Sequence, residues 1–210
     1  MKPKRDDDND VRRRLLQAAT QMCAESGFKA ASVRKICERA GANLAMVNYY
    51  FGSKDELYLA VIQRASDGRF METLAPLQDS SVPAAERLRA MIARLMSSLL
   101  SEGPDSDVAR LISWEMVEPT PALVVIVDTL ARPMNDAMRA LVHEISPTKL
   151  TEDRARLHAF SIMGQVVLYS HSRPMHVLLA PELHYDDAGI AAIAEHITAF
   201  SLRGLGVADA

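Results

Sequence analysis

Residues 32 to 54, SVRKICERAGANLAMVNYYFGSK, decide the fold of the N-terminal part of this chain. The first half of the stretch has four apolar residues at the spacing i, i+3, i+4 and i+7, which places them on one face of a short helix. They are Val33, Ile36, Cys37 and Ala40. The hydroxyl of Ser32 can cap this helix, and Gly41 predicts its end. A second helix is expected over residues 43 to 51, so the stretch predicts two helices joined by a tight turn.

The second of these helices has one apolar face and one face that is left free. Val47 and Phe51 are four residues apart, so they lie together and are expected to pack against the first helix. The other side carries Ala45, Asn48 and Tyr49, with Met46 on the flank. A helix-turn-helix motif needs this division, because its first helix braces the second while the free face of the second enters the major groove of DNA.

The segment that follows the motif begins with a capping box. Ser53 and Glu56 have the S-x-x-E spacing, so a further helix should start at once and run to about residue 69. The connection after Gly52 therefore has almost no slack. Any movement of this next helix is expected to reach the second helix of the motif through one or two residues.

The segment before the motif predicts a disordered tail and then a helix. Residues 1 to 10 are almost all polar or charged, so they cannot bury apolar surface. A helix is expected over residues 11 to 26, with Gly27 as its end. Three arginines at positions 12 to 14 stand in its first turn, where the helix dipole disfavours positive charge. A nearby phosphate backbone would explain them, and so would simple exposure to solvent.

Charge divides the chain more sharply than its net value of −3 suggests. Residues 11 to 54 carry eight Lys or Arg and two acidic residues, a balance of +6, whereas residues 71 to 210 carry eleven and eighteen, a balance of −7. This asymmetry favours one part that faces phosphate and another that does not. A window of this length can also reach such a charge by chance.

The remainder of the chain predicts an all-α protein. Helical spacing recurs without strand alternation or an internal repeat, and the expected segments are residues 83 to 101, 107 to 118, 120 to 145 with a kink at Pro133, 151 to 179, and 186 to 203. An apolar content of 49% is ample for a buried core. The longest aliphatic run is far shorter than a membrane span, and no signal peptide is recognisable, so a cytoplasmic protein without membrane contact is expected. Cys23 and Cys37 lie on apolar helix faces and are expected to be buried free thiols.

Several motifs around residues 11 to 60 resemble the N-terminal domain of the TetR family of transcriptional regulators. They are Gly27-Phe28, the S-V-R-x-I spacing from Ser32, Ala40-Gly41, and YFGSKDEL from Tyr50 to Leu57. The resemblance implies an all-helical homodimer in which three small helices bind operator DNA and a larger C-terminal domain binds an effector and dimerises. With the disordered tail that composition predicts over residues 1 to 10, it gives a DNA-binding domain over 11 to 56 and an effector-binding and dimerisation domain over 57 to 210.

The resemblance assigns DNA contacts residue by residue. Four residues are expected to face the groove, and three to hold phosphate through a side chain or a helix N-terminus. The first set is Ala45, Met46, Asn48 and Tyr49, and the second is Ser32, Asn43 and Lys54. Asn48 departs from the family, which commonly has tyrosine there, and an asparagine can make a bidentate contact to adenine. Tyr50 and Phe51 are expected to be packing residues.

The C-terminal half is similar to the CecR-like subgroup of this family. The resemblance lies in E-x-x-x-P-T-P-A-L from Glu115, Arg132-Pro133, Gly164-Gln165 and Tyr169. It implies a homodimer through the last two helices, whose apolar stripes are Leu157, Phe160, Ser161, Gly164, Val167 and Leu168 on one, and Ile190, Ile193, Ala194, Ile197, Phe200 and Ser201 on the other. Both stripes could instead complete the core of one subunit. A pocket for a small apolar or amphipathic effector is expected from Trp114, Met116, Met138, Met163, Gln165 and Tyr169.

Other classes of function have weaker support. The histidines at 143, 158, 171, 176, 184 and 196 could suggest a metal sensor, but no pair has the i, i+4 spacing of a helical metal site. No nucleophile elbow, phosphate loop or HExxH motif points to an enzyme, and no cofactor is expected. A ligand-responsive, DNA-binding regulator, in the repressor mode usual for the family, is therefore the main hypothesis. A helical adaptor that binds proteins but not DNA is the alternative.

Overall fold

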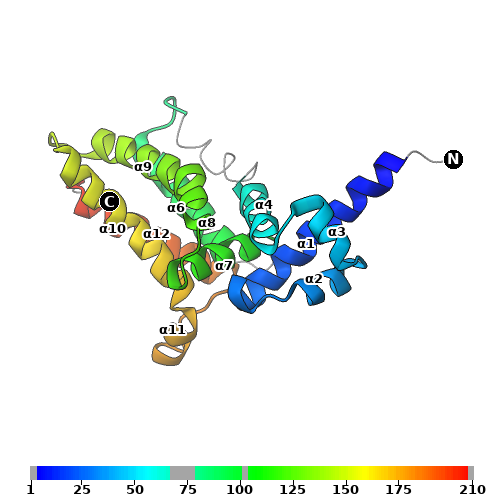
Figure 1. Cartoon of the computed structure of the whole chain (residues 1–210). Helices are drawn as coiled ribbons and strands as arrows, with labels where there is room; N and C mark the ends of the chain where they lie inside the picture. The colour runs from blue at the N-terminus through cyan, green and yellow to red at the C-terminus, as the bar shows by residue number, and fades with distance from the viewer. Residues whose placement is uncertain (1–3, 67–78, 101–103, 208–210) are drawn as a thin grey trace. The chain divides into compact units, whose positions relative to one another are not determined.

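All regular elements in the described part of the chain are helical, which confirms the expected fold class (Figure 1). The structure, a computed structural model, describes residues 4 to 66, 79 to 100 and 104 to 207. The chain forms two compact units, one of Met1–Gly68 with Gly103–Thr129, the other of Arg69–Glu102 with Leu130–Ala210. Within the described residues, no helix has the length and apolar character needed to span a bilayer.

The first unit joins the N-terminal helices to a segment from much later in the chain. Its helices are α1 (Lys4–Ala30), α2 (Val33–Ala40), α3 (Leu44–Phe51), α4 (Lys54–Ser66), α7 (Pro104–Val117) and α8 (Ala122–Ile126). Helix α1 packs against α2, α4 and α7, while α4 also packs against α3, α7 and α8. The expected end of α4 near residue 69 lies outside the described residues. Helices α7 and α8 are therefore neighbours of the N-terminal helices, although α4 ends at Ser66 and α7 begins only at Pro104.

Helix α1 begins earlier than the sequence predicts. Its first residue is Lys4, so residues 4 to 10, expected in a disordered tail, are helical. Asp10 forms ion pairs with Arg13 and Arg14 one turn further on, and the hydrogen bond from Arg13 lowers the pKa of the Asp10 carboxyl. The arginines thus lie well inside the helix, and the interpretation that they oppose the dipole at its first turn is wrong.

The regular part of α1 breaks at Gly27, as expected, because α7 passes close to its backbone there. Gly27 has φ 77 and ψ 162, and the chain is helical again up to Ala30. A Cβ at this position would lie 3.1 Å from the Trp114 ring, and the Trp114 indole N–H donates to the Ala24 carbonyl at 3.2 Å. Glycine is required here because it tolerates positive φ and leaves room for the tryptophan.

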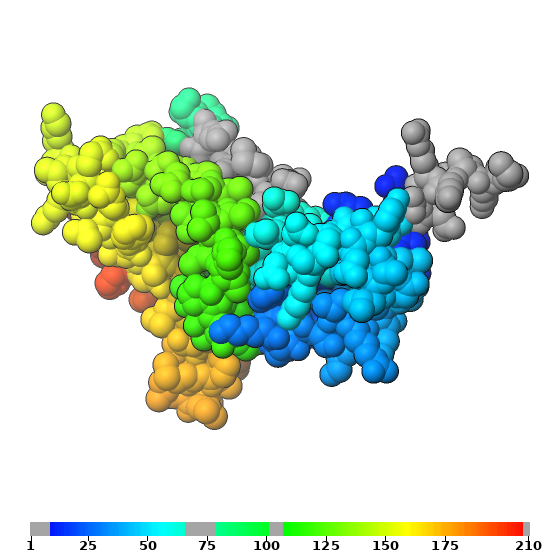
Figure 2. Space-filling view, in the orientation of Figure 1, coloured from blue at the N-terminus to red at the C-terminus, as the bar shows by residue number. Residues whose placement is uncertain are grey.

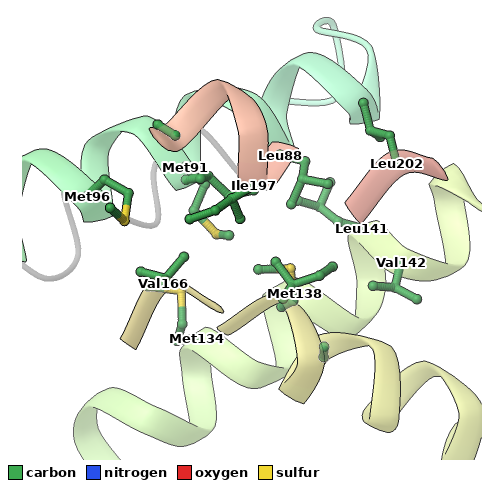
Figure 3. Close-up of a cluster of buried hydrophobic side chains, with 14 of the residues drawn as sticks. Leu88, Met91, Met96, Met134, Met138, Leu141, Val142, Val166, Ile197 and Leu202 are labelled. Atoms are coloured by element: carbon green, nitrogen blue, oxygen red, sulfur yellow. The ribbon is translucent and has the colours of Figure 1, made fainter. Parts of the chain in front are cut away.

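The second unit is a helical bundle around one apolar core. Its helices are α6 (Ala84–Leu100), α9 (Arg132–Ile145), α10 (Glu152–His171), α11 (Arg173–Leu179) and α12 (Asp187–Gly204). Figure 3 shows side chains of α6, α9, α10 and α12 directed toward one another, among them Met91, Met138, Val166 and Ile197. Methionines supply much of this core, consistent with the ability of an unbranched thioether to fill irregular space.

Pro133 interrupts the long helix expected over residues 120 to 145, as predicted, but the interruption is a π-helical turn. Helix α8 runs into η1 (Val127–Ala131), and α9 starts at Arg132 with Pro133 in its first turn. Proline cannot donate an N–H, and its ring crowds the carbonyl four residues earlier. A wider turn relieves this crowding. The chain passes from the first unit to the second within η1.

The single helix expected over residues 151 to 179 is wrong. Helix α10 ends at His171, and Ser172 is both its C-cap and the N-cap of α11. Pro174 lies in the first turn of α11, where its ring fits a helix start but could not continue α10. Helix α11 has no buried residue. Figure 2 shows it, in orange, standing out from the surface of the second unit.

Candidate nucleic-acid interface and effector cavity

The two helices of the motif pack as their apolar spacing predicts. On α2, Ile36, Cys37 and Ala40 are buried, and on α3 the buried residues are Val47 and Phe51. Gly41 adopts the left-handed conformation, φ 60, and its N–H bonds back to the last turn of α2. Phe51 is further covered by Arg12, whose guanidinium carbon lies 5.3 Å from the centre of the ring. The brace that a helix-turn-helix needs is therefore in place.

The opposite face of α3 is open. Ala45 and Asn48 are exposed, Met46 is half-buried, and Tyr49 exposes 75% of its surface. The Tyr49 ring meets the half-buried Tyr50 edge-on, with 4.9 Å between ring centres. Tyr49 is thus held by a neighbour while remaining accessible.

Leu44 belongs to the same open face, although the sequence interpretation did not select it. It is a large apolar side chain left exposed at the first position of α3. Its position four residues before Asn48 places both on one side of the helix. That spacing was available in the sequence and could have identified it.

The helix starts expected to face phosphate differ in how they are capped. The Asn43 side chain accepts the Met46 backbone N–H at 3.1 Å and caps α3. Ser32 is the N-cap residue of α2, but its hydroxyl makes no capping hydrogen bond, contrary to expectation. The half-buried Ser32 hydroxyl and the first N–H groups of α2 are therefore available to an anion.

Lys54 is partly committed to contacts within the unit. Its ammonium lies 4.4 Å from the centre of the Phe28 ring and donates to the Lys29 carbonyl at 3.3 Å. These contacts hold the start of α4 against the end of α1. The half-buried Lys54 thus contributes to packing as well as to the positive charge near the motif.

The joint between α3 and α4 is as short as the capping box predicts. Gly52 has φ 81 and ψ −53, and its N–H donates to the Asn48 carbonyl at 3.0 Å. The Glu56 N–H donates to the Ser53 hydroxyl at 3.1 Å, while that hydroxyl lies 3.4 Å from the Glu56 carboxylate. One orphan backbone N–H at the start of α4, that of Glu56, is thereby satisfied, and α4 begins two residues after Gly52.

The two stripes expected at a dimer interface differ in exposure. On α10, Leu157, Phe160 and Leu168 are exposed, and a Cβ added at Gly164 would have nothing within 4 Å. On α12 the stripe from Ile190 to Ser201 is buried in the core of the second unit. Phe200 is its exception, being 58% exposed. Thus α10 presents an uncovered apolar face, whereas most of the α12 stripe completes the subunit core.

The six residues expected to form one effector pocket do not share one unit. Trp114 and Met116 belong to the first unit, where Trp114 packs over Gly27 and Met116 is exposed. Met138 is fully buried in the core of the second unit, and Met163 packs against that core. The Gln165 amide donates to the Ser161 carbonyl at 3.3 Å and the Ser201 hydroxyl at 3.4 Å.

Tyr169, the sixth residue, lines a cavity of about 200 Å³ in the second unit. The cavity lies between the end of α10, α11 and the turn that follows, and its other lining residues are Leu168, His176, Leu179, Ala180 and Leu183. The Tyr169 and His176 rings meet edge-on, with 5.3 Å between centres, and the His176 Nδ1 lies 3.0 Å from the Tyr185 hydroxyl. The cavity therefore combines aliphatic walls with polar ring atoms. Sequence reasoning had considered His176 only as a metal ligand.

Family comparisons agree with this geometry. Residues 15 to 61 match the family described as bacterial regulatory proteins, tetR family. Residues 84 to 205, more than half of the chain, match the family described as HTH-type transcriptional dual regulator CecR, C-terminal domain. The chain belongs to the TetR family of transcriptional regulators. Both resemblances expected from the sequence are confirmed, and the open face of α3 belongs to a DNA-binding helix-turn-helix.

Named relatives of this TetR-family regulator include a dual regulator and an activator. The HTH-type transcriptional dual regulator CecR of Shigella flexneri is 25% identical over 90% of this chain and 88% of its own. The HTH-type transcriptional activator FasR of Mycolicibacterium smegmatis is 30% identical over 74% of this chain and 68% of its own. Among solved structures, AibR in complex with isovaleryl coenzyme A and operator DNA has a TM-score of 0.70 at 18% identity, covering 90% of this chain and 97% of that one. The likeness to AibR concerns the fold.

Membership of the TetR family also decides between classes of function. The family consists of transcriptional regulators, so this regulator is not an enzyme. In the part of the chain that the structure covers, no three His, Cys, Asp or Glu side chains are grouped to hold a metal ion.

Alkaline pH should destabilise the regulator through Cys23, which is buried on α1. Burial raises the pKa of this thiol from an ordinary value of 9.0 to about 12. Between these values the unfolded chain loses a proton that the folded chain keeps, so stability falls as pH rises, by about 1.4 kcal/mol per pH unit for one thiol. Urea unfolding at pH 8, 9, 10 and 11 measures the slope. In the Cys23→Ala variant this slope of unfolding free energy against pH should be smaller by the contribution of one proton. Equal slopes in both proteins would refute the assignment.

Proposed function

We propose that this protein is a ligand-responsive regulator that binds a palindromic operator as a homodimer and is released from DNA by a small effector. The observation that carries the proposal is the helix-turn-helix, in which α2 braces the buried side of α3 and leaves Ala45, Asn48 and Tyr49 exposed. Such a regulator acts in the cytoplasm, on double-stranded DNA. It needs no cofactor and no metal for this role.

The DNA contacts divide into groove contacts and phosphate contacts. Ala45, Met46, Asn48 and Tyr49 read base edges, and Leu44 adds an apolar contact on the same face. Phosphate is held at two helix starts, by Ser32 on α2 and by Asn43 on α3, together with the charge of Lys54. The exposure of the α3 face and the uncapped Ser32 hydroxyl support this division.

The homodimer forms through α10 and α12 of each subunit. Support comes from the exposed apolar face of α10, where Leu157, Phe160 and Leu168 flank Gly164. A large apolar patch of this kind marks an interaction surface. A glycine in its middle allows another helix to approach closely, because it presents no side chain. Phe200 is the contribution expected from α12.

The effector is a small apolar or amphipathic molecule, and its binding region is the C-terminal domain over residues 57 to 210. Tyr169 lies in a cavity whose walls are aliphatic and whose polar atoms come from His176 and Tyr169. That composition suits an apolar body with one polar group. The structural relative AibR was solved with isovaleryl coenzyme A, which carries a short branched acyl group. Met138, Met163 and Gln165 are proposed to respond to effector binding through the core of the second unit. Trp114 and Met116 are proposed to respond to it through the first unit.

Repression is the proposed mode of action, in which the bound dimer blocks a promoter until the effector arrives. A hundredfold loss of operator affinity needs a coupling of only about 2.7 kcal/mol. Because one named relative is an activator and another a dual regulator, whether this protein represses or activates needs its own test. A reporter gene under the selected operator, with and without the regulator, answers it: repression requires that expression rises when the regulator is deleted.

The proposal is tested by selecting binding sites from random double-stranded DNA and titrating the winner by fluorescence anisotropy at 50 and 200 mM salt. A palindromic winner, bound with nanomolar affinity at the lower salt and much more weakly at the higher, is expected. Recovery of no enriched sequence, together with no salt-dependent binding, would favour the helical adaptor that binds proteins but not DNA.

Substitution of Asn48 by alanine should change which base is preferred at one position of each operator half-site. An asparagine can form two hydrogen bonds to adenine in the major groove, worth about 1–3 kcal/mol of discrimination, and alanine can form none. Parallel site selections with wild type and Asn48→Ala measure the change. Lys35→Ala, at an exposed position of α2 that is not among the proposed base contacts, is the control and should keep the wild-type motif. An identical motif for Asn48→Ala would remove Asn48 from base recognition.

A further inference from the structure

A buried carboxylate connects three parts of the first unit. Glu115 on α7 is only 1% exposed. One oxygen, Oε1, accepts the Tyr58 hydroxyl of α4 at 2.9 Å and the Thr120 hydroxyl at 2.8 Å, while Oε2 accepts the Thr120 backbone N–H at 2.9 Å. The Thr120 hydroxyl in turn accepts the Ala122 N–H at 3.1 Å, at the start of α8. Helices α4, α7 and α8 thus meet at one side chain.

The arrangement suits a carboxylate. Three donors meet the two oxygens, and both oxygens act as acceptors. A buried charge is costly unless such hydrogen bonds compensate for lost water. A glutamine removes the negative charge, and its NH₂ group would force the Tyr58 and Thr120 hydroxyls to turn and accept instead of donate, so it changes the network while keeping the size of the side chain. Glu115 and Thr120 belong to the E-x-x-x-P-T motif, which lies outside the helix-turn-helix.

The contacts around Glu115 attach α7 and α8 to the DNA-binding helices. Trp114, the residue before it, covers the break of α1 at Gly27. Glu118, one turn later, forms an ion pair with Lys29 at 3.6 Å. Tyr58, which donates to Glu115, is itself buried and packs on the Phe28 ring with 4.7 Å between centres. Helix α4, which begins directly after the Gly52 joint, is therefore held from the side by residues of α7.

We infer that Glu115 is a positioning residue for operator binding. Through Tyr58 it fixes α4, and through the capped joint at Gly52 and Ser53 it fixes the angle at which α3 enters the groove. Glu115 itself is buried and touches no DNA. This inference rests on the proposed function, because it assigns a role in operator recognition to a network outside the DNA-facing surface.

A merely structural role would have a different signature. If Glu115 only stabilised the fold, its loss would lower the folded fraction and weaken every DNA sequence equally. If it sets the orientation of α3, its loss weakens the selected operator while leaving non-specific binding nearly unchanged, because backbone contacts tolerate small rotations and base contacts do not. The ratio of operator affinity to non-specific affinity separates the two.

The experiment compares wild type with Glu115→Gln, Tyr58→Phe and Thr120→Val in the full chain. Tyr58→Phe keeps the ring and removes only the hydroxyl, so it is the variant least expected to disturb folding. Anisotropy titrations on the selected operator and on a scrambled duplex, at least 20 °C below each measured Tm, give the affinity ratio. The control is Asp107→Asn, a partly exposed acid of α7 whose ion pair with Arg110 stays within that helix.

The expected result is a roughly tenfold fall in the affinity ratio for Glu115→Gln and Tyr58→Phe, with less than a twofold change for Asp107→Asn. The double variant Glu115→Gln with Tyr58→Phe should fall no further than the single ones, because both break one contact. An unchanged ratio for folded Tyr58→Phe and Glu115→Gln overturns the inference while leaving the proposed function intact. Absence of operator binding by the wild type would overturn both, and is seen before any variant is made.

Discussion

Replacing Phe160 with glutamate should convert the regulator from a dimer to a monomer and lower its operator affinity by a hundredfold or more. Phe160 is 57% exposed in the middle of the α10 face and belongs to the proposed interface. A buried, unpaired carboxylate at its centre would oppose association. A dimer gains from holding two half-sites at once, an effect of about 10²–10⁴ in affinity that a monomer loses. Light scattering at micromolar concentration measures the mass, and anisotropy measures the affinity.

The matched control is Val117→Glu, which places the same charge on an exposed apolar residue of α7, 71% exposed in the first unit. It should leave the protein dimeric. A Phe160→Glu protein that keeps the dimer mass would show that α10 is not the interface. A monomer with undiminished operator affinity would instead contradict binding as a dimer.

Replacing Gly52 with alanine should destabilise the first unit by about 1–3 kcal/mol and weaken operator binding at least tenfold. The backbone at Gly52 has φ 81, a conformation that side chains rarely adopt. An added Cβ would also overlap the Glu56 carboxylate, which belongs to the capping box of α4. The Glu56 carboxylate can rotate away at the expense of the capping box, but relief of the backbone strain must change the joint between α3 and α4. Thermal unfolding and anisotropy on the selected operator measure the two effects.

Gly204→Ala is the comparison for this glycine. It lies on α12, has no positive φ, and a Cβ there meets nothing within 4 Å. Alanine favours helix over glycine, so this variant should be neutral or slightly more stable, with unchanged operator affinity. If Gly52→Ala behaved like Gly204→Ala, the joint between α3 and α4 would have slack that its backbone does not suggest.

The parts predicted well from sequence are those decided within a few residues. The faces of α2 and α3, the Gly41 turn and the capping box at Ser53 depend on spacing and on local hydrogen bonds. The break at Pro133 was placed for the same reason, since a missing N–H acts on the adjacent turn. The long helix across Pro174 failed because helical periodicity on both sides of the proline concealed a short second helix.

The candidate effector residues show what composition cannot decide. Methionine, tryptophan and tyrosine suit a pocket and a core equally, and Met138 became core while Tyr169 reached a cavity. Trp114 covers a helix break in the first unit. Lys54, expected to hold phosphate, also binds the Phe28 ring and the Lys29 carbonyl.

The sequence by itself determined that the chain is all-helical, that residues 32 to 54 form a helix-turn-helix, and that α4 follows it without slack. Local spacing, capping groups and glycine conformation suffice for each. Only the tertiary structure decided that α7 and α8 pack beside α4, that Glu115 receives the Tyr58 hydroxyl, and that α10 rather than most of the α12 stripe is left uncovered. These facts depend on which distant surfaces meet, and an apolar or acidic residue has the same local pattern whether a partner helix covers it or not.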